Sequence, residues 1–328
     1  MTKLNPTEAR AGADKVLTHL ALGYRPSKNY VGLQVAPAVS VPERGGLVLE
    51  FDDSCFLEED DLRADGAAYR EINRGYEGVP FSIRQHGYIY KAGEAEYEES
   101  ARRGINQSTI AVDELTKKSN LMVERQIADM VFNPNNYIAD RKQVVSAGSY
   151  WGGDGANSVD PYNAILYARR LISQSIGSDP THMVVGREVW DAIITNEKLL
   201  AHYSQTSHAA ITKKVLAERY GLEEILVGGA TSKKTTTENN TFMWGNFAAL
   251  FYRSSKIVSG QLGLAASNAY SRQDPSSFYT YVYQNHPKVS GQWYERQNGS
   301  YCWKIDYDRQ PVMPMPQSAF LFINPVKL

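Results

Sequence analysis

The chain has 328 residues, a length typical of two domains or of one domain with extensions. Hydrophobic residues make up 42% and charged residues 22%, which excludes a largely disordered protein, and the net charge of −1 disfavours a dedicated nucleic-acid binder. Two cysteines, Cys55 and Cys302, are too few for a disulfide framework or a cysteine zinc site. Tyrosine is frequent, with 21 residues against 10 phenylalanines, and its polar ring suits hydrated interfaces.

Residues 1–45 lack the periodic apolar positions of a compact core. A short helix is expected over 9–22, and the prolines that follow predict extended chain, because each proline keeps its predecessor out of the helical region. We expect no secretory signal, and the longest apolar run, 247–252, is far below the ~20 residues that span a membrane. We expect the rest of the protein or a neighbouring copy to hold this arm.

Residues 46–100 predict a strand-rich and highly charged excursion. A strand over 47–51 leads into it, and the alternating segment 79–90 predicts a returning strand. Between Asp52 and Glu71 the chain carries eight acidic and two basic residues, a local charge of −6. We expect a segment with this much negative charge to contact a basic surface elsewhere.

The middle of the chain predicts helices and strands in alternation. A long amphipathic helix is expected over 108–132, capped by Ser108 or Thr109 and stopped by Asn133-Pro134. After the helix start at Asp160-Pro161, glycines at 177 and 221 are expected to end two helices. The expected elements are a helix from 161 to 177, a strand over 183–186, a helix over 189–194, a helix over 207–220 and a strand over 224–227.

Residues 241–328 predict mainly strands. One bent strand or two strands are expected within 242–253, and further strands over 278–283 and 320–323. The hairpin over 293–305 is the clearest local signal, because Asn298-Gly299 is typical of a two-residue type I′ turn.

Motifs of catalysis, metal binding and nucleotide binding are missing from the sequence. The acidic run 94–99 could supply paired carboxylates to a hydrolase, but a solvated acidic face beside Arg102 and Arg103 explains it better. The glycine-rich stretch 151–157 does not have the spacing of a calcium loop, and His182 and His202 form no metal-ligand pair. We therefore predict no catalytic, cofactor-binding or metal-binding residues, and expect that the surfaces of the protein matter more than any pocket.

Several segments, taken in chain order, resemble motifs of the major capsid proteins of tailed bacteriophages. Their fold is shared with encapsulin shells and herpesvirus capsid floors. Each motif is weak alone, and it is their shared order that is specific. The segments are 35–42, 60–63 with 68–72, 108–132, Trp151 followed by Asp160-Pro161, 182–192, 216–228 and 243–250.

The resemblance implies an α+β capsid fold with an N-terminal arm, an extended loop, a peripheral domain with a long spine helix and an axial α/β domain. The corresponding division is an arm over 1–45, an extended β loop over 46–100, a peripheral domain over 101–150 and 268–312, and an axial domain over 151–267 and 313–328.

The function that the resemblance implies is a non-enzymatic one, self-assembly into an icosahedral shell around packaged double-stranded DNA. The implied partners are other copies in hexamers and pentamers, a separate scaffolding protein, a portal, in some members a decoration protein, and weakly contacted DNA, with no membrane and no cofactor. The virion is the implied location, after synthesis in the host cytoplasm. An encapsulin-like cargo shell and, in a different class, a carboxylate-based hydrolase are the alternatives.

Contacts between copies are expected to involve the acidic excursion and a basic stretch. Residues 207–256 carry seven basic and four acidic side chains, a local charge of +3 that complements the excursion. The inter-subunit contact residues predicted on the excursion are Asp52, Asp53, Glu58, Asp60, Asp61, Arg63, Tyr69 and Arg70.

Overall fold

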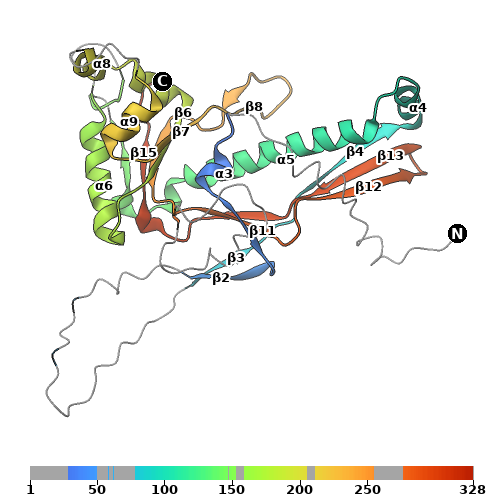
Figure 1. The fold of residues 1–328 in the computed structure, drawn as a ribbon, viewed down its shortest axis with the longest axis horizontal. Coiled ribbons are helices and arrows are strands. Elements are labelled where there is room, and N and C mark those ends of the chain that lie inside the picture. The colour runs from blue at the N-terminus through green and yellow to red at the C-terminus, as the bar shows by residue number, and fades with distance from the viewer. Residues whose placement is uncertain are drawn as a thin grey trace.

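The computed structural model describes residues 29–49, 58, 62, 78–146, 148–152, 159–204, 211–254 and 276–327. The helix expected over 9–22 lies outside these residues. The molecule is elongated: a sheet with several helices forms one end, a smaller sheet forms the other, and helix α5 (Gln107–Val131) runs between them (Figure 1).

Helix α5 confirms the long amphipathic helix predicted from the sequence. Its 25 residues make a rod of about 37 Å at a rise of 1.5 Å per residue. The N-cap is Asn106 rather than Ser108 or Thr109, because the Asn106 side chain accepts the backbone N–H groups of both residues, at 3.1 and 3.3 Å. At the other end, Asn133-Pro134 stops the helix and opens a single 3₁₀ turn over Pro134–Asn136.

A five-stranded mixed sheet forms the centre of the helical end. Its strands alternate between two cores: Met183 and Val185 of one strand face the first, whereas Val184 between them faces the second. The first core lies under α6, α7 and α9, and the second lies against α5. The strand order is β5 (Lys142–Val144), β15 (Ala319–Ile323), β10 (Phe247–Phe251), β6 (His182–Gly186) and β7 (Glu224–Gly228).

Four helices surround the first core at this end of the molecule. Gly177 and Gly221 end two of them with φ of +66° and +68°, which confirms both predicted glycine stops. Thr212 caps the last helix, which therefore begins later than the predicted 207. The helices are α6 (Tyr162–Ile176), α7 (Arg187–Ile194), α8 (Glu197–Ser204) and α9 (Lys213–Tyr220); α8 was not expected from the sequence.

The far end of α5 is covered by the antiparallel sheet β12 (Lys288–Glu295), β13 (Ser300–Asp306) and β4 (Gly87–Gly93), with helix α4 (Glu94–Arg102) at its tip. Trp303 and Ile305 of the sheet pack on Val112 and Leu115 of α5. The predicted type I′ turn is wrong, because Glu295 pairs with Ser300 and leaves a four-residue loop in which Gly299 has positive φ and Asn298 does not.

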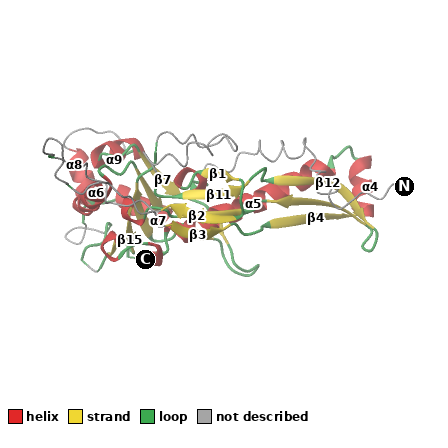
Figure 2. Cartoon of the chain, turned by 90° about the horizontal axis from the view of Figure 1, so that it is seen from below, coloured by secondary structure: helices red, strands yellow, loops and turns green. Residues whose placement is uncertain are grey.

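The middle of the molecule joins segments that are far apart in sequence (Figure 2). Strand β1 (Ala38–Val41) pairs in parallel with β11 (Tyr279–Tyr283), which pairs with β14 (Arg309–Val312). A separate hairpin consists of β2 (Gly45–Leu49) and β3 (Gly78–Ser82), so the segment 79–90 forms two strands, β3 and β4, instead of one. Other short elements are α3 (Gly32–Val35), β8 (Thr231–Ser232) and β9 (Thr241–Phe242).

Candidate functional site

The predicted contact residues belong to the excursion whose stem is the hairpin β2–β3. Of these eight residues the structure describes Glu58, whose side chain is exposed. The other seven lie outside the described residues: Asp52, Asp53, Asp60, Asp61, Arg63, Tyr69 and Arg70.

An ion pair between exposed Arg44 and buried Asp308 anchors the base of this hairpin to the corner between β13 and β14. Arg44 approaches the carboxylate of Asp308 to 2.6 Å and lies 4.3 Å above the centre of the Tyr283 ring. The same carboxylate accepts the backbone N–H of His86, and His286 Nδ1 accepts the backbone N–H of Asp308 at 3.1 Å. Burial lowers the pKa of His286, which agrees with this accepting, unprotonated nitrogen. Charged and hydrogen-bonded groups therefore hold the base of the hairpin β2–β3 in place.

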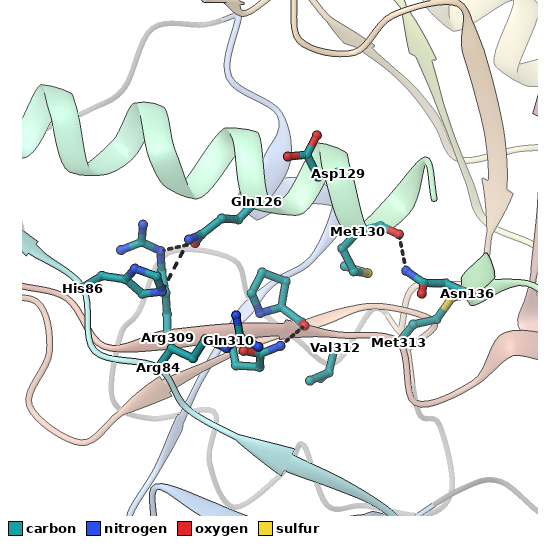
Figure 3. Close-up of a pocket in the computed structure, with 11 residues that line it drawn as sticks. Arg84, His86, Gln126, Asp129, Met130, Asn136, Arg309, Gln310, Val312 and Met313 are labelled. Atoms are coloured by element: carbon teal, nitrogen blue, oxygen red, sulfur yellow. Dashed lines mark hydrogen bonds between the residues drawn. The ribbon is translucent and has the colours of Figure 1, made fainter. Parts of the chain in front are cut away.

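Beside this anchor lies a cavity of about 460 Å³, between β14, α5 and the chain that precedes β4 (Figure 3). The guanidinium of Arg309, a buried residue, donates from Nε to Gln126 Oε1 at 2.8 Å and from a terminal nitrogen to the carbonyl of Tyr307 at 2.9 Å. Arg84 and His86 line the same space. Neither Arg84 nor Gln126 carries a sequence signal for this role, because the three chain segments meet only in the folded protein.

A second junction joins the N-terminal part of the chain to α5. The carboxylate of Glu124, which is 2% exposed, accepts the backbone N–H of Val31 at 2.9 Å, that of Gly32 at 2.7 Å and the indole N–H of Trp244 at 2.6 Å. Burial raises the pKa of Glu124, whereas the three donated hydrogen bonds favour its charged form. The signal for this residue is in the sequence, since Glu124 shares a helix face with the buried Ile127.

Trp244 lies where the quoted sequence motifs meet. A Cβ added to Gly228 would approach the Trp244 ring to 2.1 Å, and one added to Gly186 would lie 1.8 Å from the carbonyl oxygen of Gly245. These two glycines therefore allow the ends of β7 and β6 to pack directly against the Trp-Gly pair. Three of the segments that carry the capsid resemblance, 182–192, 216–228 and 243–250, thus share one packing role.

The acidic run 94–99 does not form a catalytic pair. It lies on α4, none of whose side chains is buried. Glu98 and Glu99 pair with Arg102 and Arg103 one turn later, as a solvated helix face would. Among the described residues no group of three or more histidine, cysteine, aspartate or glutamate side chains could hold a metal ion.

The basic stretch 207–256 is only partly a free surface. Lys213, Lys214, Lys233 and Lys234 are exposed, whereas Arg219 lies 2.6 Å from Asp160 within the subunit. The tyrosine-rich strand β11 also turns inward: Tyr279 and Tyr281 are 3% and 6% exposed. The frequent tyrosines suggest hydrated interfaces, but these two rings pack inside their own subunit.

Known proteins related in sequence are phage proteins. No protein-family model matches the chain. The major capsid protein of Burkholderia phage BcepMu is 28% identical over 240 residues, which cover 73% of this chain and 76% of the relative. The major capsid protein of Pseudomonas phage JBD67 is 24% identical over 246 residues, covering 73% and 77%. In the part of the chain that the structure describes, no helix is long and apolar enough to cross a membrane.

Solved structures show the same fold. A phage-related protein from Bordetella bronchiseptica matches with a TM-score of 0.77 at 24% identity, covering 96% of this chain and 99% of its own. The capsid of cyanophage P-SCSP1u matches with a TM-score of 0.53 at 10% identity, covering 88% and 86%. The chain therefore has the α+β fold of phage capsid proteins, and over about three quarters of its length it resembles the major capsid proteins of phages.

Proposed function

We propose that this protein is the major capsid protein of a tailed phage, whose copies assemble into an icosahedral shell around packaged double-stranded DNA. The observation that carries the proposal is the sequence similarity to two phage major capsid proteins over 73% of the chain. The shared fold supports it over nearly the whole length. The role is structural: the carboxylates of the run 94–99 face solvent on α4 instead of sharing a pocket.

The elongated shape suits a shell subunit. Such a subunit makes head-to-tail contacts that close into rings around symmetry axes, and an elongated chain offers many such contacts along its length. In the proposed division, the arm is 1–45, the extended loop 46–100, the peripheral part 101–150 with 268–312, and the axial part 151–267 with 313–328. Hexamers and pentamers of copies are the proposed building units.

The proposal extends to partners and place. A separate scaffolding protein and a portal are the expected partners, with a decoration protein as in some capsids, and the protein is made in the host cytoplasm and resides in the virion. The net charge of −1 favours weak, non-specific contact with the packaged DNA, because a strongly basic wall would hold DNA tightly.

An encapsulin-like cargo shell is the alternative within the fold. A virus-like particle from Pyrococcus furiosus shares the fold with a TM-score of 0.51 at 11% identity, so a particle that is not named as a phage capsid also has this fold. The sequence relatives favour the phage capsid, since both are phage proteins.

Electron microscopy of the purified protein tests the proposal. Expressed alone and with the neighbouring phage genes, the chain is expected to form closed shells, and shells made in infected cells are expected to contain DNA. Shells that enclose a cargo enzyme would favour the encapsulin-like alternative. Monomers or dimers under all conditions would refute a shell function.

We further propose that the acidic excursion meets basic surface on a neighbouring copy. Its charge of −6 and the exposed lysines of the +3 stretch support this. Reversing Asp60 and Asp61 to lysine is expected to weaken assembly and to reduce its dependence on salt. Glu114→Lys on the exposed face of α5 is the matched control, and equal assembly of all three proteins at every salt concentration would contradict the contact.

A further inference from the structure

The cavity beside the hairpin base contains a cation without a charged partner. Arg309 is 2% exposed, and its two hydrogen-bond acceptors, the Gln126 side chain and the Tyr307 carbonyl, are both neutral. Nowhere in the described ranges does a carboxylate lie within ion-pair distance of its guanidinium. A buried charge without a counter-charge is costly, and in folded proteins such groups are paired or bind ions.

The groups around Arg309 make the cavity positive. Arg84 is exposed and stands on the cavity wall with His86 (Figure 3). The carboxylate of Asp129 also lines the space, but Arg125 holds it at 3.0 Å. Asp308, the neighbour of Arg309 in sequence, is engaged by Arg44. Two arginines therefore remain available to an anion.

We infer that this cavity binds a carboxylate side chain contributed by a second copy of the chain, from its acidic segment 52–71. This rests on the proposed shell function. Arginine presents a planar set of donors that matches a carboxylate, and a volume of about 460 Å³ admits one acidic side chain with its flanking residues. The segment has the complementary charge of −6, and its eight acidic residues are enough to meet this cavity as well as the lysines of the stretch 207–256. The depth of Arg309 suits a narrow inserted side chain better than a phosphate on the outside of a DNA duplex.

Assembly measurements on charge variants test the inference. Arg84→Glu changes an exposed residue of the cavity wall, and is expected to raise the subunit concentration needed for half-maximal shell formation at least tenfold. Arg102→Glu, whose side chain is 79% exposed at the end of α4, is the matched control and is expected to stay within twofold of the wild type. Thermal melting of dispersed subunits shows whether each variant is folded. If Arg84→Glu does not fold, Arg84→Gln replaces it in the assembly measurements.

A double-mutant cycle identifies the partner segment. With all eight acidic residues of the segment 52–71 replaced by their amides, Arg84→Glu is expected to change assembly less than twofold, because the attraction it reverses is gone. A tenfold effect in both backgrounds would show that the acidic segment is not the ligand. Arg84→Glu could instead destabilise the dispersed subunit and leave assembly unchanged. This result would show that the anionic partner of Arg84 lies in the same chain, and would also overturn the inference.

Inorganic phosphate separates the remaining sources of an anion. At constant ionic strength, phosphate is expected to inhibit assembly of the wild type and not of Arg84→Glu. Phosphate that raises the melting temperature of the dispersed wild type without changing assembly would indicate a site for a free anion. Loss of packaged DNA with normal assembly of Arg84→Glu would indicate a DNA contact, and either result overturns the inference. If the wild type forms no shells the proposed function fails, whereas wild-type shells with unchanged Arg84→Glu assembly refute the role of the cavity alone.

Discussion

Replacing Glu124 by alanine is expected to lower the free energy of unfolding by about 3–5 kcal/mol. The substitution removes the acceptor for three buried donors, two backbone N–H groups of α3 and the Trp244 indole. Each buried donor left without a partner costs about 1–3 kcal/mol. Three such donors would cost about 3–9 kcal/mol together. We expect a value near the lower end of this total, because the variant no longer has to bury a carboxylate.

Glutamine at position 124 is expected to cost less. Oε1 of Glu124 accepts both Val31 and Trp244, whereas Oε2 accepts Gly32 alone. A glutamine whose oxygen takes the place of Oε1 keeps the hydrogen bonds from Val31 and Trp244. Its NH₂ group then faces the Gly32 N–H, which loses its acceptor, and the free energy of unfolding is expected to fall by about 1–3 kcal/mol. Glu114→Ala is the control on the same helix. It breaks an exposed pairing with Lys117 and is expected to cost less than about 0.5 kcal/mol.

Urea unfolding of dispersed subunits measures these differences, and hydrogen exchange locates them. In the alanine variant the amides of Val31 and Gly32 are expected to exchange much faster than in the wild type, because they lose their acceptor. The reasoning would be refuted if Glu124→Ala cost no more than Glu114→Ala, or if the two amides kept their protection.

Two further predictions concern pH and close packing. Burial holds the pKa of His182 at about 4 in the folded chain, so between pH 6.5 and 4 the unfolded chain binds more protons and acid destabilises the fold. From neutral pH to pH 5, the free energy of unfolding of the wild type is expected to fall by about 2 kcal/mol more than that of His182→Asn, as measured by urea unfolding. Gly186→Ala is expected to lower the free energy of unfolding by at least about 3 kcal/mol, because the added Cβ would lie 1.8 Å from the Gly245 carbonyl oxygen. Gly93→Ala is the control and is expected to cost less than about 1 kcal/mol, because no other atom lies within 4 Å of its added Cβ. Thermal melts measure both, and similar melts for the two variants would contradict the packing.

Local signals in the sequence predict the helices that carry a periodic apolar face and a clear end. Helix α5 has both, and the ends of α6 and α9 follow from Gly177 and Gly221. Helix α4 has no buried residue and therefore no apolar stripe, so its acidic run predicts only a solvated face. The turn at Asn298-Gly299 fails because the strand pairing, not the dipeptide, sets the loop length.

The candidate sites depend on contacts that sequence spacing does not encode. Gln126 and Arg309 are 183 positions apart, and no local pattern places them together. Glu124 is different, because a carboxylate on the apolar face of a helix itself predicts that buried hydrogen-bond donors lie against it. The resemblance to phage major capsid proteins follows from the order of weak motifs, three of which meet in one packing unit around Gly186, Gly228 and Trp244.

The parallel pairing of β1 with β11 links folding to protein synthesis. Thr280 donates its backbone N–H to the carbonyl of Pro37 and its hydroxyl to that of Ala36, so β1 finds its partner only after about 240 further residues have been made. At about 5–20 residues per second this interval is about 12–50 s. A nascent chain therefore lacks the β1–β11 pairing until residues 279–283 have been made. The pairing ties completion of this sheet to the synthesis of β11, so a subunit is not fully folded before that strand has been made.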